Sequence, residues 1–194
     1  MAVITKLQAA HGQLVTAIYL YFDDGDPAAI HTLACVSREI YEKHCKAKGL
    51  DRMFEYVASA NANRPAKELW DILNGPRNFL KHPAADYDLS ASLELDDDMN
   101  ATVLFYASHD CAVLCREATP AEVQGFNVWY LATKFPENQG RDDPDSVLAE
   151  EIQARLKETY PGLRTAPLEE QKRTGKLILQ QSRMAVVEGW NRFP

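Results

Sequence analysis

The sequence has little of several residue types that mark special classes of protein. Its 194 residues include four cysteines, nine glycines and ten prolines. That is too little cysteine for a disulfide-stabilised scaffold, and too little glycine and proline for a collagen-like or low-complexity chain. No stretch approaches the roughly 20 apolar residues that a membrane-spanning helix needs. The chain begins without a charged segment followed by an apolar run, so no secretory signal is evident. We therefore expect a cytoplasmic protein with reduced thiols and no membrane partner.

Basic residues are also scarce relative to acidic ones. The chain has 21 lysines and arginines against 28 aspartates and glutamates, and its formal net charge is −7. This balance excludes a protein that coats nucleic acid with a generally basic surface, because phosphate binding needs clustered Lys and Arg. Most of the negative charge lies in residues 83–98, which contain six acidic residues and no basic one. The rest of the chain is almost neutral, so the composition is compatible with one small phosphate site.

The pattern that the chain does have is helical. Regularly spaced apolar residues predict a helix over residues 4–22, which ends at the turn sequence Asp23-Asp24-Gly25. Asp26 and Pro27 then predict a second helix, with Asp26 as the N-cap and Pro27 at the first helical position. Gly49 is a suitable residue to follow its end. Because the connection is short, we expect the two helices to form an antiparallel hairpin.

The remaining chain is predicted to alternate between helices and loops. Asn74-Gly75-Pro76 should break a helix, and the polar segment 136–146 is the best candidate for a domain boundary. The expected elements are a less regular region at 50–63, helices at 65–73 and 77–82, a loop at 83–98, and helices at 98–115, from 120 onward, at 146–159 and at 167–183. The predicted fold is therefore all-α, with a helical bundle over residues 1–135 and a helical C-terminal extension over residues 136–194 packed on it.

One short segment carries recognisable chemistry, namely Arg77-Asn78-Phe79-Leu80-Lys81-His82. Asn78 lies four residues before His82 and shares its helix face, and Arg77 is long enough to converge with His82 on one cleft. An Arg can hold a phosphate bidentately, and a His can take a proton from a 2′-hydroxyl or protonate a leaving oxygen. An Asn can orient either group. The alternative interpretation is a short surface helix with His82 at its C-terminal end.

This segment resembles the signature of the HEPN superfamily, an Arg with a polar residue directly after it and a His a few residues further on. Arg77, Asn78 and His82 fill these positions. The predicted hairpin also resembles HEPN domains, in which such a hairpin packs with two later helices in an up-and-down bundle. The chain is similar, in addition, to a group of bacterial proteins of about this length. The resemblance covers residues 4–135.

The resemblance implies a metal-independent endoribonuclease or an RNA-binding protein that uses no cofactor. Arg77 would clamp the phosphate, His82 would transfer the proton and Asn78 would orient them. HEPN proteins commonly form homodimers that bring two motifs into one cleft, so a second copy of the chain is an expected partner. The alternative is a non-catalytic module for dimerisation or for binding a protein partner, in which His82 only closes a helix.

Two sets of side chains have spacings that would suit zinc. They are His31 with Cys35 and Glu42, and Cys111 with Cys115 and the nearby His109. Neither set contains a tight Cys-x-x-Cys pair, and a helical Cys usually packs as a small hydrophobic side chain. We therefore predict no metal site from the sequence.

Two further groups can be interpreted in two ways. The aromatic residues can stack on bases but more often form a core; they are Tyr19, Tyr21, Phe126, Trp129 and Tyr130. The basic residues near the C-terminus can contact nucleic acid but more often form a solvated helix face; they are Lys172, Arg173, Lys176 and Arg183. We favour core and solvated face.

Overall fold

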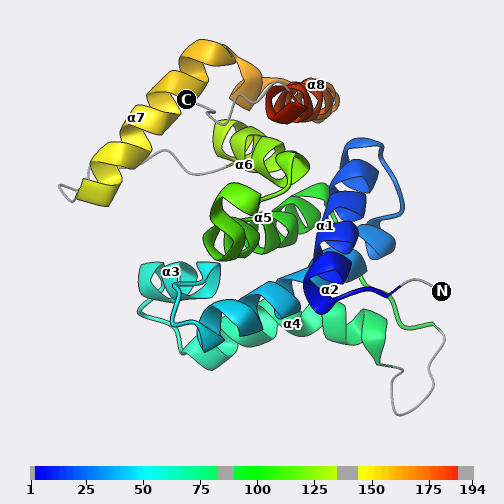
Figure 1. The fold of residues 1–194 in the computed structure, drawn as a ribbon. Coiled ribbons are helices and arrows are strands. Elements are labelled where there is room, and N and C mark those ends of the chain that lie inside the picture. Colours follow the sequence, from blue (N-terminus) through cyan, green and yellow to red (C-terminus); the bar gives the residue numbers. More distant parts are fainter. Residues whose placement is uncertain (1–2, 83–89, 135–143, 188–194) are drawn as a thin grey trace. The chain divides into compact units, whose positions relative to one another are not determined.

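The structure is a computed structural model that describes residues 3–82, 90–134 and 144–187 (Figure 1). Within these ranges the regular elements are all helical, and no strand is present. The predicted all-α class is therefore confirmed, and the helices form a bundle. None of the described helices combines the length and the apolar character that crossing a bilayer requires.

Eight α-helices and two 3-10 turns occupy the described ranges. The elements are α1 (Lys6–Phe22), α2 (Pro27–Ala47), α3 (Met53–Ala60), α4 (Ala66–Lys81), α5 (Asp97–Cys115), η1 (Arg116–Ala118), α6 (Ala121–Thr133), α7 (Pro144–Thr159), η2 (Leu163–Thr165) and α8 (Leu168–Val187). They group into two compact units, Met1–Val123 and Gln124–Pro194, which we call unit 1 and unit 2. The boundary predicted at 136–146 falls mostly on residues 135–143, outside the described residues.

Local capping chemistry explains the start of the α1–α2 hairpin. Thr5 and Gln8 form a reciprocal capping box at the start of α1. The Asp26 carboxylate accepts the Ala29 N–H at 2.7 Å, and Pro27 occupies the first position of α2. The predicted start of α2 is therefore confirmed. α1 and α2 pack on each other and on α5, and these three helices hold the core of unit 1.

The region around Pro76 differs from the prediction. Asn74-Gly75-Pro76 does not break the chain, because α4 runs without interruption from Ala66 to Lys81 with Pro76 inside it. A proline inside a helix removes one hydrogen bond and crowds the preceding turn. Here Asn74 and Pro76 are both buried, and α4 packs on α2. Tertiary packing compensates for the local cost, so the separate short helix predicted at 77–82 is the last part of α4.

The region predicted to be less regular, 50–63, contains the short helix α3. Its first backbone N–H, that of Met53, donates to the Asp110 carboxylate on α5 at 2.7 Å. A side chain 57 positions away in the sequence therefore helps to cap this helix. A helix of eight residues is too short for its apolar periodicity to predict it from the sequence.

The core of unit 2 includes the aromatic residues of α6. Phe126, Trp129 and Tyr130 are buried, which confirms that they form core. The Trp129 indole N–H donates to the Gln171 carbonyl at 2.7 Å. Gly125 allows α6 and α8 to approach closely, since a Cβ there would lie 2.7 Å from the Ser182 hydroxyl oxygen.

Candidate functional site

The three residues of the predicted site lie at the C-terminal end of α4. Asn78 and His82 are exposed, whereas the side chain of Arg77 is only 15% exposed. The backbone N–H of His82 donates to the Asn78 carbonyl at 3.0 Å, so His82 is the C-cap and closes the last turn of the helix. The Asn78 side-chain oxygen lies 3.5 Å from Nη1 of Arg77, at the outer limit for a hydrogen bond.

Arg77 is fixed by a carboxylate on the neighbouring helix. Its Nη2 lies 2.5 Å from Oε1 of Glu39 on α2, and its buried Nε has no hydrogen-bond partner among the described residues. An ion pair between a planar guanidinium and a carboxylate orients the arginine side chain. Nη2 therefore faces Glu39, and Nη1 faces the exposed Asn78.

The predicted convergence of Arg77 and His82 is only partly reproduced. The two side chains share the last part of α4, but in the described part of the chain they form no hydrogen bond with each other. Arg77 turns toward α2, and His82 is exposed at the helix end. The acidic segment that follows His82 lies partly outside the described residues, at 83–89. Its last part starts α5, where Asp96 accepts the Met99 N–H at 2.7 Å.

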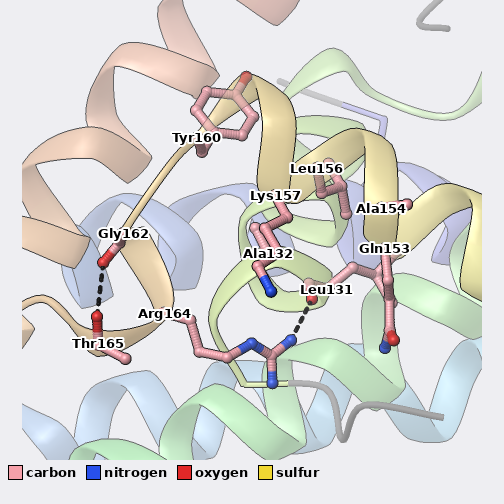
Figure 2. A pocket seen from close by; sticks show the side chains of 10 residues that line it. All are labelled: Leu131, Ala132, Gln153, Ala154, Leu156, Lys157, Tyr160, Gly162, Arg164 and Thr165. Carbon is pink, nitrogen blue, oxygen red and sulfur yellow. Dashed lines mark hydrogen bonds between the residues drawn. The ribbon is translucent and has the colours of Figure 1, made fainter.

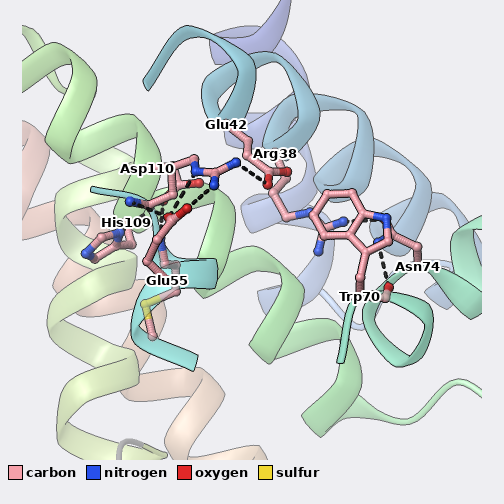
Figure 3. A network of polar contacts seen from close by, with 9 residues as sticks. Arg38, Glu42, Glu55, Trp70, Asn74, His109 and Asp110 are labelled. Atoms are coloured by element: carbon pink, nitrogen blue, oxygen red, sulfur yellow. Dashed lines mark hydrogen bonds and ion pairs between the residues drawn. The ribbon is translucent and has the colours of Figure 1, made fainter. Parts of the chain in front are cut away.

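A buried polar network joins α2 to α4 next to this site (Figure 3). Nη2 of Arg38 donates to the Asn74 side-chain oxygen at 2.6 Å, and the Asn74 amide donates to the Trp70 carbonyl at 2.7 Å. The Arg38 guanidinium also lies 5.8 Å from the centre of the Trp70 ring. Arg38 and Asn74 are each only 3% exposed. Since Arg38 precedes Glu39, this network fixes the same stretch of α2 that orients Arg77.

A second polar cluster joins α2, α3 and α5 (Figure 3). Nη1 of Arg52 lies 3.1 Å from Oε1 of the buried Glu42, and Arg52 also pairs with Glu55. On α5, the Asp110 carboxylate contacts the His109 ring nitrogen at 3.1 Å as well as the N–H of Met53. This cluster anchors α3, and none of its residues belongs to the predicted site.

Glu42 should give the protein a specific pH dependence. Burial raises the pKa of its carboxyl above the ordinary value of 4.5, against the opposing effect of Arg38 and Arg52, while Asp110 and Glu39 raise it further. The folded state therefore binds this proton more tightly than the unfolded chain. Between 4.5 and the raised pKa, the contribution of Glu42 to stability falls as the pH rises.

We expect the variant Glu42→Gln to lack this component while keeping an oxygen that accepts from Arg52. Its free energy of unfolding should increase relative to that of wild type as the pH rises above 4.5, and the difference should level off once Glu42 is ionised. Urea unfolding at a series of pH values measures this difference. Glu68→Gln, which removes an exposed carboxylate, is the control. A difference between Glu42→Gln and wild type that does not vary with pH would contradict the prediction.

The first set with a spacing suited to zinc, His31 with Cys35 and Glu42, does not come together in the structure. His31 contacts the Asn100 side-chain oxygen at 3.1 Å, and Glu42 is paired with Arg52. Burial lowers the pKa of His31 and raises that of Cys35 to about 11, so both favour their neutral forms. Among the described residues, these three form no group with metal-ligand geometry.

In the second set with a spacing suited to zinc, the two cysteines Cys111 and Cys115 meet a different histidine from the one expected. His109 is held by Asp110 and does not join the two cysteines. His11 of α1 joins them instead, and its Nε2 lies 3.4 Å from Sγ of Cys115. Sequence reasoning missed His11, since nothing in the local pattern links α1 to the end of α5.

Unit 2 contains a cavity of about 440 Å³ between η2, α6 and α7 (Figure 2). Its lining combines the side chains of Leu131, Leu156 and Tyr160 with the cations Lys157 and Arg164. Arg164 already donates to the Leu131 carbonyl at 3.2 Å. None of the residues of the predicted site lines this cavity.

The basic residues of α8 do not form one solvated face. Lys172 is buried, which contradicts the prediction for this residue. Arg173 is exposed and lies 3.9 Å from Glu170, one helical turn away. Lys176 and Arg183 are exposed, in agreement with the prediction. A helix that buries one of its four cations offers a weaker basic surface than the sequence spacing indicates.

The fold and the site together define an all-α helical protein with a polar cluster at the end of α4. Comparisons with models of protein families, with curated proteins and with solved structures found no match.

Proposed function

We propose that this chain is a HEPN-like protein that binds RNA and cleaves it without a metal ion, acting as a homodimer. Arg77 contacts the phosphate, His82 transfers the proton and Asn78 orients them. In the reaction, His82 takes the proton of a 2′-hydroxyl, whose oxygen attacks the adjacent phosphorus. The bond to the 5′-oxygen breaks, this oxygen takes up a proton from solvent water, and the products are a 2′,3′-cyclic phosphate and a 5′-hydroxyl end.

The observation that carries this proposal is the combination of an oriented Arg77 with two exposed polar neighbours. Glu39 holds one edge of the guanidinium, while the Nη1 side faces Asn78. Asn78 and His82 are exposed on the same helix end, so RNA can reach both. An arginine held in advance loses less conformational freedom when it binds a phosphate.

A specific observation also favours the non-catalytic alternative. The carboxylate of Glu39 neutralises the charge of Arg77 at 2.5 Å, which weakens any interaction with phosphate. α4 also exposes large apolar side chains, with Ile72 at 57% and Phe79 at 42%. Under this alternative, α4 contacts a second copy or a protein partner, and His82 only closes the helix.

The test is incubation of the full chain with single-stranded RNA in EDTA. Circular dichroism in the same buffer establishes that the protein stays folded, and light scattering gives its oligomeric state. Cleavage that produces 2′,3′-cyclic phosphate ends supports the proposal. A folded dimer that neither binds nor cleaves RNA would contradict it and support the non-catalytic module.

A further inference from the structure

Three potential metal ligands from two helices meet in unit 1. Cys111 and Cys115 are four residues apart on α5 and therefore share one helix face. His11 reaches the same place from α1, with its Nε2 3.4 Å from Sγ of Cys115. One ring nitrogen of His11 and the two sulfur atoms all lie within 4.8 Å of one another.

These separations can be compared with the geometry of a zinc site. With zinc–sulfur bonds of about 2.3 Å and zinc–nitrogen bonds of about 2.0–2.1 Å, tetrahedral angles place a nitrogen and a sulfur ligand about 3.6 Å apart and two sulfur ligands about 3.8 Å apart. The distance from His11 to Cys115 is already close to the first value. Small rotamer adjustments would bring the distance from His11 to Cys111 to the first value and the distance between the two sulfur atoms to the second.

A buried hydroxyl lies beside the cluster. The O–H of Tyr41 is fully buried next to the sulfur of Cys111, with which it interacts. A thiolate accepts a hydrogen bond more strongly than a thiol does, and hydrogen bonds to metal-bound ligands are common in metal sites. Tyr41 would therefore stabilise Cys111 in its metal-bound form.

Zinc binds cysteine as the thiolate and histidine as the neutral imidazole, so the ion would displace the thiol protons of Cys111 and Cys115 on binding.

We propose that His11, Cys111 and Cys115 bind one Zn²⁺ ion, with water in the fourth position. A donor set of one imidazole and two thiolates binds zinc in preference to the hard cations Mg²⁺ and Ca²⁺. His11 and Cys115 are each partly accessible to solvent, which leaves a path for the ion and for the water. The site would tie α1 to the C-terminal end of α5. It does not depend on the proposed ribonuclease activity.

The experiment uses the full chain, freed of metal by a chelator under reducing conditions and then titrated with Zn²⁺ against a chromophoric competitor. We expect one equivalent to bind, and Cys115→Ser to lower the affinity by more than about tenfold. His44→Ala, which removes an exposed histidine on α2, is the matched control for His11→Ala. The control should bind like wild type, whereas His11→Ala should not.

Cobalt provides a second measurement that needs no variant. Co²⁺ bound to the wild-type chain should show the sulfur-to-metal charge-transfer bands of a tetrahedral thiolate site. The proposal is overturned if these bands are absent, or if Cys115→Ser and His11→Ala bind Zn²⁺ as tightly as wild type. RNA cleavage is not a readout here, so failure of this proposal and failure of the proposed function can be told apart.

Discussion

Replacing His82 with alanine is expected to lower the rate of RNA cleavage by about 10²–10⁴-fold, the usual contribution of a positioned general acid or base. The side chain of His82 is exposed, and its backbone N–H, which an alanine retains, makes the hydrogen bond that closes α4. The substitution therefore removes the imidazole and leaves the helix end intact. The measurement is the initial rate of cleavage of single-stranded RNA in EDTA.

The neighbouring residue supplies the control for this variant. Lys81 is also exposed and also lies at the end of α4. Lys81→Ala should weaken RNA binding slightly and reduce its salt dependence, with little change in the rate at saturating RNA. Both variants should keep wild-type stability to within about 0.5 kcal/mol, because both sites are on the surface. Equal rates for His82→Ala and wild type would remove His82 from the reaction.

Helices with strong local signals are predictable from the sequence. The start of α2 is an example, since Asp26 and Pro27 act within a few residues of their own positions. The cap that the sequence predicts at this position is the one that the structure contains. Interactions between neighbours in the chain need no knowledge of the fold, which is why this prediction succeeds.

Helices that depend on distant residues are not predictable in the same way. α3 starts where Asp110 of α5 accepts the N–H of Met53, and α4 continues through Pro76 because its buried face packs on α2. In both cases a tertiary contact outweighs the local preference. The turn sequence Asn74-Gly75-Pro76 is a poor helix former, but the sequence does not show the partner that Arg38 provides for Asn74.

The candidate site shows the same division. The sequence places Arg77, Asn78 and His82 within one short segment, and the structure keeps them at one helix end. The sequence does not indicate that Glu39 pairs with Arg77, because the two residues lie on different helices. Likewise, the spacing of Cys111 and Cys115 is visible, but their histidine partner is 104 positions from Cys115. Pairings across such distances follow from helix packing alone.

Arg38→Ala is expected to lower the free energy of unfolding by about 3–5 kcal/mol, the usual cost of removing one partner from a buried charged network. Arg38 is 3% exposed, donates to Asn74 at 2.6 Å and faces the ring of Trp70. Its removal leaves the buried Asn74 oxygen without this donor and weakens the compensation of the Glu42 charge. Urea unfolding followed by circular dichroism measures the loss.

Two further variants separate the causes of this loss. Arg38→Met keeps much of the side-chain volume against Trp70 but removes the charge, so it should be less destabilising than Arg38→Ala. Lys67→Ala on α4 removes an exposed cation that pairs with Asp71, and it should change stability by no more than about 0.5 kcal/mol. If Arg38→Ala unfolds with the same free energy as Lys67→Ala, the buried network does not hold α4 on α2. In that case the orientation of Arg77 would depend on Glu39 alone.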